Sequence, residues 1–297
     1  MKKSIYGIIK LFRFNEYVYI ILITSMLGVA SSQGSIGGRF IILTLANLFA
    51  VSFVFMFNDI EDAPLDALSA SDSNHNPIAT GLLTPKTAKL AAGSVAILSV
   101  AFFVYLGFWP LLFGLGILIL GYFYSCRGFK LRSMIALDIF SNSLMLAGLP
   151  FLCAYFTYAT KFTHDGFWPF VFVMSLSLYI SFYYKLRRPL IDSNLSQNGK
   201  TPGFSDRSTN ILMILILVIG VVSGAVTLFI IEIIPFWVYG IIAILTILFI
   251  FPAWLVIRKG EQNLTFHLLL LLPLTRATAI ALALQHLLPW FTSILRG

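Results

Sequence analysis

The chain has 297 residues, of which 59% are hydrophobic and only 11% are charged, and its mean hydropathy is +0.91. Soluble globular proteins carry about 25% charged residues, so this composition excludes a soluble globular domain. The formal net charge of +8 suggests either a nucleic-acid partner or a membrane topology signal, and the distribution of the basic residues decides between them.

The apolar residues fall into long segments of about 20 residues, the length at which a helix crosses the roughly 30 Å hydrocarbon core of a bilayer. Their apolarity is continuous and lacks the alternation of a barrel strand, which favours helices. The segments between them are too short to fold alone, so we expect one domain over residues 1–297. We predict nine spans, at about 17–34, 40–57, 87–107, 109–125, 135–157, 168–185, 209–231, 236–257 and 264–292. The predicted fold class is an all-α polytopic membrane protein.

The segment before the first span has a basic start and then an apolar part that Arg13, Asn15 and Glu16 interrupt. This pattern predicts an interfacial helix rather than a cleavable signal peptide. The two cysteines, Cys126 and Cys153, have neither a disulfide framework nor metal-site spacing.

The basic residues are unequally divided between the two sides of the predicted bundle. Alternating sides along nine spans places three of them on one side, Arg39, Lys161 and Arg296, and Arg276 within the last span. The remaining sixteen fall on the other side: Lys2, Lys3, Lys10, Arg13, Lys86, Lys89, Arg127, Lys130, Arg132, Lys185, Arg187, Arg188, Lys200, Arg207, Arg258 and Lys259. Cytoplasmic loops are enriched in Lys and Arg, so the N-terminus and the large polar loops are predicted to be cytoplasmic. The basic excess is then first a topology signal.

The stretch NDIEDAPLD, residues 58–66, follows directly after an apolar run and holds four of the chain's 12 acidic residues. Asn58, Asp62 and Asp66 stand at steps of four, and residues four apart share one face of a helix. Asp59 and Glu61 are predicted to point elsewhere. The spacing and the local enrichment together indicate a site rather than solvated residues at a helix end.

Two further polar loops lie on the same predicted side. The first, YSCRGFKLRS at 124–133, carries Arg127 and Lys130 and leads to Asp138 just inside a span, where an ionisable group is functional by default. The second, at 186–208, holds Asp192 and Lys200. The ligating and charged side chains therefore gather at one membrane face.

Stacked acids beside basic loops at a membrane face indicate a metal-bridged polyphosphate. Carboxylate and amide oxygens suit Mg²⁺, which binds through one or two carboxylates plus substrate phosphate. Arg and Lys neutralise the remaining phosphate charge. The neighbouring spans would hold an apolar tail, so a lipid diphosphate fits all three features.

The order of these motifs resembles that of the UbiA superfamily of intramembrane prenyltransferases, and the resemblance extends over nearly the whole chain. The resemblance rests on Asn58-x3-Asp62-x3-Asp66, on the Tyr124-Ser125 pair before a basic loop, and on an Asp-led loop that ends in GKT at 199–201. It implies a nine-helix bundle with a central cavity and a cytoplasmic cap. It also implies an enzyme that uses Mg²⁺ to transfer an isoprenyl group from an allylic isoprenyl diphosphate to a lipophilic acceptor.

The resemblance also implies roles for single residues. It makes Asn58, Asp62, Asp66 and Asp192 the metal ligands, with Asp62, Asp66 and Asp192 catalytic. It makes Asn58, Arg127, Lys130, Tyr124 and Lys200 the residues that bind the diphosphate. We expect a multi-pass protein of a prokaryotic plasma membrane, with the active site on the cytoplasmic side.

The chain departs from the family pattern in the third loop. Ser196 stands where a second Asp usually follows Asp192, and Asn76 stands before Pro77 where many members carry Arg. The incomplete second motif leaves a terpene synthase or cyclase without an acceptor as an alternative. A transporter or channel is a third possibility, since intramembrane acids can line an ion pathway. The acceptor, the prenyl chain length and the oligomeric state are left open by the sequence.

Overall fold

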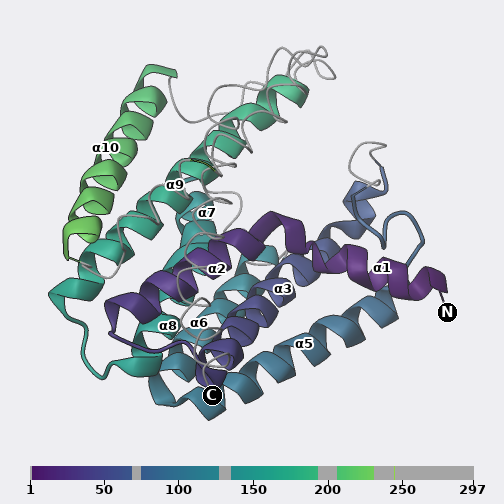
Figure 1. Cartoon of the computed structure of the whole chain (residues 1–297). Helices are drawn as coiled ribbons and strands as arrows, with labels where there is room; N and C mark the ends of the chain where they lie inside the picture. Colours follow the sequence, from purple (N-terminus) through teal and green to yellow (C-terminus); the bar gives the residue numbers. More distant parts are fainter. Residues whose placement is uncertain (1, 69–74, 127–134, 193–205, 231–243, 245–297) are drawn as a thin grey trace.

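A computed structural model gives the structure of the chain and describes residues 2–68, 75–126, 135–192, 206–230 and 244. All the regular elements within these ranges are helical (Figure 1). In chain order they are α1 (Lys2–Phe12), α2 (Phe14–Ser31), α3 (Gly38–Asp66), α5 (Pro85–Leu106), α6 (Phe108–Ser125), α7 (Ile135–Ser143), the π-helical η2 (Leu144–Gly148), α8 (Leu149–Tyr158), α9 (His164–Asp192) and α10 (Asp206–Ile230).

Six membrane-length apolar helices confirm the predicted fold class of an all-helical integral membrane protein. They are α2, α3, α5, α6, α9 and the continuous segment Ala136–Tyr158 that joins α7, η2 and α8. Helix α10 adds a shorter apolar stretch, Ile211–Thr227. Together these helices coincide with the first seven predicted spans. Apart from Ile244, the predicted spans at 236–257 and 264–292 lie outside the described residues.

Neighbouring helices pack in pairs around one large apolar core. Helix α3 lies along α5, α2 lies along α8, and α9 lies along α10 (Figure 1). The core includes the fully buried side chains of Ile21, Leu43 and Phe151. Where α2 meets α8, a Cβ on Gly28 would lie only 2.6 Å from the Cβ of Ala154. Small residues of this kind allow close approach of helices in a membrane.

Helix α3 is too long for the bilayer. Its 29 residues extend about 43 Å at about 1.5 Å per residue, whereas the hydrocarbon core is about 30 Å thick. The excess corresponds to the polar residues 58–66, because the apolar part of the helix ends just before them. The helix continues through Pro64 to its end at Asp66. The fold therefore carries the acidic motif out of the apolar layer on a regular helix.

Helix α1 lies across the end of the bundle that carries this motif (Figure 1). Its buried face packs there: Leu11 is fully buried, and Gly7 comes close to the backbone oxygen of Leu82, just before α5. On another face Ile5 and Tyr6 are more than half exposed. One face of α1 therefore packs on the protein, and a second face with large apolar side chains is exposed. This arrangement fits the predicted interfacial helix.

Candidate active site

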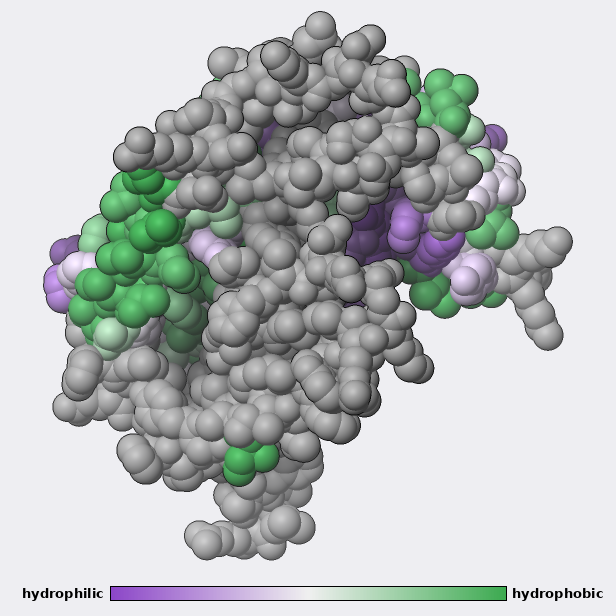
Figure 2. All heavy atoms as spheres, turned by 90° about the horizontal axis from the view of Figure 1, so that it is seen from above, coloured by the Kyte–Doolittle hydropathy of each residue, from purple (hydrophilic) through white to green (hydrophobic). Residues whose placement is uncertain are grey.

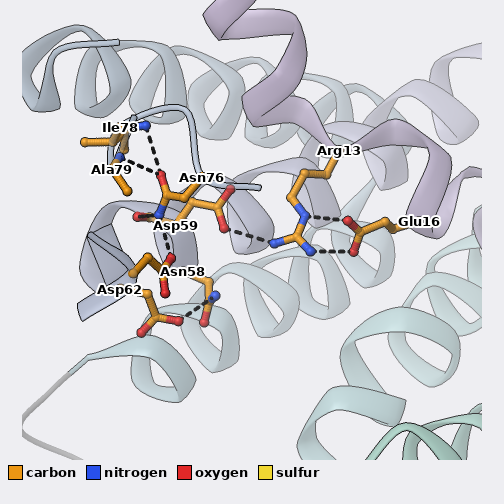
Figure 3. Close-up of polar contacts among 9 residues, drawn as sticks. Arg13, Glu16, Asn58, Asp59, Asp62, Asn76, Ile78 and Ala79 are labelled. Atoms are coloured by element: carbon orange, nitrogen blue, oxygen red, sulfur yellow. Dashed lines mark hydrogen bonds and ion pairs between the residues drawn. The ribbon is translucent and has the colours of Figure 1, made fainter. Parts of the chain in front are cut away.

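The acidic motif occupies the last turns of α3, and its spacing has the predicted effect. The Nδ2 of Asn58 donates a hydrogen bond of 3.0 Å to Oδ2 of Asp62, so these two side chains share a face of the helix (Figure 3). Asp66 follows one turn later, at the final residue of α3. Both Asp62 and Asp66 are partly exposed, so their carboxylates are accessible to a ligand.

Asp59 points to a different partner, as the spacing predicts. It is only 3% exposed, and its Oδ1 accepts a hydrogen bond of 3.0 Å from Nη1 of Arg13 (Figure 3). Arg13 stands between α1 and α2 with φ of 50°, in the left-handed region. The same guanidinium bonds both carboxylate oxygens of Glu16, at 2.6 and 2.7 Å. The bidentate pair with Glu16 fixes the guanidinium within the α1–α2 junction. The bond to Asp59 then connects this junction to α3.

The two carboxylates stabilise the charged form of Arg13. Burial lowers the pKa of Arg13, but the hydrogen bond with Glu16 and the charges of Asp59 and Glu16 outweigh it, so that its pKa lies above the ordinary value. A base with a raised pKa contributes stability that is fully present below its unfolded pKa and is lost only as the pH rises through the folded value. The ion pair is therefore insensitive to deprotonation of Arg13 at physiological pH.

A turn after the motif returns to the end of α3 through Asn76. This residue is 2% exposed, and its Nδ2 donates to the backbone oxygen of Asp59 at 2.7 Å and to Oδ2 of Asp66 at 2.9 Å. Its Oδ1 accepts from the backbone nitrogen of Ile78 at 2.9 Å, in the manner of an Asx turn (Figure 3). Asn76 thus ties the following segment to one carboxylate of the motif.

The surface around this end of α3 is polar and recessed. Figure 2, seen from above, shows hydrophilic side chains gathered in a hollow on the right, on the side where α1 and the end of α3 lie in Figure 1. Apolar surface dominates the opposite, left side of the same view. A polar recess of this kind suits the charged head of a ligand.

The donors at this end consist of carboxylate and amide oxygens, the set that Mg²⁺ prefers. Within the described part of the chain, no three His, Cys, Asp or Glu side chains come together as a ready-made metal cage. Asn58, Asp62 and Asp66 therefore fit a Mg²⁺ ion that takes its other ligands from water and from the phosphate oxygens of a substrate, which is the usual way in which Mg²⁺ binds.

A second polar group lies on α6, α7 and α9. The hydroxyl of Tyr124 donates a hydrogen bond of 2.6 Å to Oδ1 of Asp138, which is 1% exposed. One turn further along α7, Nδ2 of Asn142 donates to Oγ of Ser181 at 3.1 Å. Helix α6 ends and α7 begins at the end of the bundle where α3 ends, because α3, α5 and α6 run alternately up and down. The Tyr124–Asp138 pair therefore belongs to the same half of the bundle as the acidic motif.

Helix α7 changes register immediately after these polar residues. The backbone nitrogen of Leu149 bonds the oxygen of Leu144, five residues back, which closes the π-helical turn η2. Pro150 follows and lacks the N–H that would continue the α-helical ladder. Such π-turns are frequent at functional sites, and this one alters which face α8 presents relative to Asp138.

The side chains of four predicted site residues lie outside the described part of the structure. Arg127, Lys130 and Lys200 lie outside the described residues. Asp192 is the last residue of α9, and its side chain is outside the described part of the structure. The structure thus brings Asn58, Asp62 and Asp66 to the end of one helix and places Tyr124 in the same half of the bundle. The second motif lies outside the described side chains.

Sequence reasoning missed two residues of this site. The sequence places Arg13 only in an interfacial helix and marks Asn76 only as a departure from the family pattern. The Asn-Pro dipeptide at 76–77 does indicate a turn, because Asn bonds its own backbone two residues on. Nothing in the sequence pairs Arg13 with Asp59, because the two are 46 positions apart.

The sequence profile of the UbiA prenyltransferase family matches residues 19–272. This match covers most of the chain and includes the acidic motif, the basic loop after Tyr124 and the loop after Asp192. The chain belongs to the UbiA prenyltransferase family. The family is one of prenyltransferases, which supports the general activity class that the resemblance implies.

Solved structures of UbiA homologues share the fold. A homologue from Archaeoglobus fulgidus bound to GPP and Mg²⁺ superposes with a TM-score of 0.65 at 16% identity, over 94% of this chain and 98% of that one. A structure described for digeranylgeranylglyceryl phosphate synthase gives a TM-score of 0.67 at 16% identity, over 96% and 99%. The Archaeoglobus fulgidus homologue was also solved with DMAPP and Mg²⁺, with a TM-score of 0.64 at 16% identity over 94% and 97%. No curated protein matches the chain. At this identity the structural matches establish the fold alone.

Proposed function

We propose that this chain is a Mg²⁺-dependent intramembrane prenyltransferase, which moves an isoprenyl group from an allylic isoprenyl diphosphate to a lipophilic acceptor. The observation that carries the proposal is the end of α3, where Asn58, Asp62 and Asp66 leave the apolar layer on one helix. Homologues of the same fold bind GPP or DMAPP together with Mg²⁺, which supports the choice of ligand.

In this proposal Asn58, Asp62 and Asp66 hold the metal and Asp192 contributes from the end of α9. The metal, when bound, neutralises the diphosphate and favours its departure. Arg127, Lys130 and Lys200 bind the phosphate oxygens, where negative charge builds as the diphosphate leaves. Tyr124 lies beside the head group, with its hydroxyl held by Asp138 at 2.6 Å.

The reaction breaks the bond between the allylic carbon and the diphosphate oxygen, and the electron pair leaves with the oxygen. The acceptor then forms a bond to the same carbon and loses a proton, for which Asp192 is the proposed base. The apolar helices exclude water, which would otherwise capture the allylic cation. The proposed active site faces the cytoplasm, because the predicted topology places most of the basic residues on its side.

The incomplete second motif supports an alternative outcome on the same chemistry. Ser196 stands where a second acid would accompany Asp192. A chain that binds no acceptor there would let the cation react with its own double bonds. The product would then be a cyclic or linear terpene rather than a prenylated acceptor. The ionisation step and the residues at the end of α3 are the same in both cases.

The test is to incubate the purified full chain with Mg²⁺, a panel of isoprenyl diphosphates of increasing chain length, and a lipid extract. We expect release of pyrophosphate that depends on Mg²⁺, together with a new prenylated lipid detected by mass spectrometry. A hydrocarbon or alcohol that forms without the extract would favour the cyclase. Absence of both pyrophosphate release and diphosphate binding across the panel would rule the proposal out.

A further inference from the structure

Asn76 makes hydrogen bonds through both ends of its amide, although it is almost completely buried. Its two donor bonds reach the end of α3, at 2.7 Å to the oxygen of Asp59 and at 2.9 Å to the carboxylate of Asp66. Its oxygen accepts from the backbone nitrogens of Ile78 at 2.9 Å and Ala79 at 3.4 Å. A buried amide with all these bonds has one available orientation, because turning it over would leave several polar groups unpaired.

Asp66 needs such a partner because of where it lies. It is the last residue of α3, and the unpaired carbonyl groups of a helix C-terminus carry partial negative charge. A carboxylate is unfavourable there, whereas a cation is favourable. The amide of Asn76 stabilises the carboxylate without neutralising it, since it supplies a hydrogen bond and no positive charge. The negative charge of Asp66 remains available to a metal ion.

We propose that Asn76 is the positioning residue for the metal site, which fixes the carboxylate of Asp66 in the orientation that receives Mg²⁺. This inference rests on the proposed function, since it assigns Asp66 to the metal. Asn76 acts through Asp66, because both ends of its own amide are bonded to the protein. It fixes one oxygen of Asp66 and leaves the other to the ligand, as the hydrogen-bonding partners of metal-binding carboxylates commonly do.

The experiment compares Asn76→Ala and Asn76→Ser with a control in the same turn, Thr80→Ala. The hydroxyl of Thr80 donates to the backbone oxygens of Asn76 at 3.3 Å and Pro77 at 3.2 Å, so its loss weakens the turn without touching Asp66. Serine at position 76 can still accept from the backbone two residues on, which preserves the turn but shortens the side chain away from Asp66. If Asn76→Ala does not fold, Asn76→Ser is therefore the variant that tests the inference.

The main readout is the thermal midpoint of the full chain in detergent as Mg²⁺ is added, at a fixed concentration of the diphosphate that gives the most turnover. A purely structural role lowers the midpoint without Mg²⁺ and leaves the half-effective Mg²⁺ concentration unchanged. A positioning role raises that concentration, and we expect a rise of about 10-fold or more in the Asn76 variants. Turnover in these variants should recover at high Mg²⁺.

A half-effective Mg²⁺ concentration within twofold of the Thr80→Ala value, in an Asn76 variant that folds, overturns the inference. The Asp66→Ala variant separates this failure from failure of the proposed function. If Asp66→Ala abolishes the Mg²⁺ effect while the Asn76 variants keep it unchanged, only the inference is wrong. If Asp66→Ala responds to Mg²⁺ like the wild type, the metal assignment and the inference are both wrong.

Discussion

Arg13 and Asp59 form an ion pair of 3.0 Å between the α1–α2 junction and the last turns of α3. The carboxylate is almost completely buried, whereas about a quarter of the arginine side chain is exposed, 27% against 4%. The guanidinium also lies 5.4 Å from the centre of the Phe55 ring. The pair therefore connects the interfacial helix to the helix that carries the acidic motif, one residue away from Asn58.

Arg13→Met should destabilise the folded protein by about 3 kcal/mol, because it leaves the Asp59 carboxylate buried without its counter-charge. The measurement is the thermal midpoint in detergent without ligand. The double variant Arg13→Met/Asp59→Asn removes both charges, so it should recover part of the loss. Equal destabilisation by the single and the double variant would show that leaving the Asp59 carboxylate without Arg13 costs no stability.

Asp62→Ala should lower Mg²⁺-dependent pyrophosphate release at least about 100-fold, since the carboxylate stabilises the departing charge only through the bound ion. The variant should fold normally, because Asp62 is partly exposed at the protein surface. Release of pyrophosphate and the ligand-free thermal midpoint are measured on the same preparation. The exposed acid Asp165, at the opposite end of the bundle, provides the control: Asp165→Ala should leave both quantities unchanged.

Tyr124→Phe should reduce turnover about 10-fold and also lower the thermal midpoint, because it removes the hydroxyl that bonds the buried carboxylate of Asp138. A hydrogen bond to a charged group contributes about 1.5–3 kcal/mol. Asp138→Asn keeps an oxygen acceptor for the tyrosine, so its effect on the midpoint should be smaller. Wild-type values of both quantities in Tyr124→Phe would contradict this role.

Gly28→Val should destabilise the bundle by several kcal/mol, since even the first carbon of a side chain would meet Ala154 and the oxygen of Phe151 at 2.6 and 2.7 Å. The contact is with α8, so the effect reports on α2–α8 packing and not on the active site. The matched control is Gly93→Val on α5, where a Cβ meets nothing within 4 Å. A comparable loss of thermal stability in both variants would show that helix propensity, and not packing, is responsible.

Much of the fold was predictable because a bilayer imposes strong rules on sequence. The helix lengths follow from apolar runs that match its thickness, and seven of the predicted spans coincide with described helices. The family followed from a short motif, since the four-residue steps of Asn58, Asp62 and Asp66 are local and need only a helix to bring them together. The sequence also predicted correctly that Asp59 lies off this face.

The contacts that fix the site were not predictable, because they join residues that are distant in the chain. Arg13 reaches Asp59 only because α1 lies across the end of α3, and Asn76 reaches Asp66 only because a turn returns there. Neither contact follows from a periodic spacing of residues in the sequence.

The sequence by itself determined the membrane class, the family and the helix face that carries the acidic motif, since each depends on composition or on spacing within one element. Only the tertiary structure decided which side chains hold that face in place. Packing brings Arg13 and Asn76 to the end of α3, where the burial of Asp59 and Asn76 makes these hydrogen bonds costly to lose.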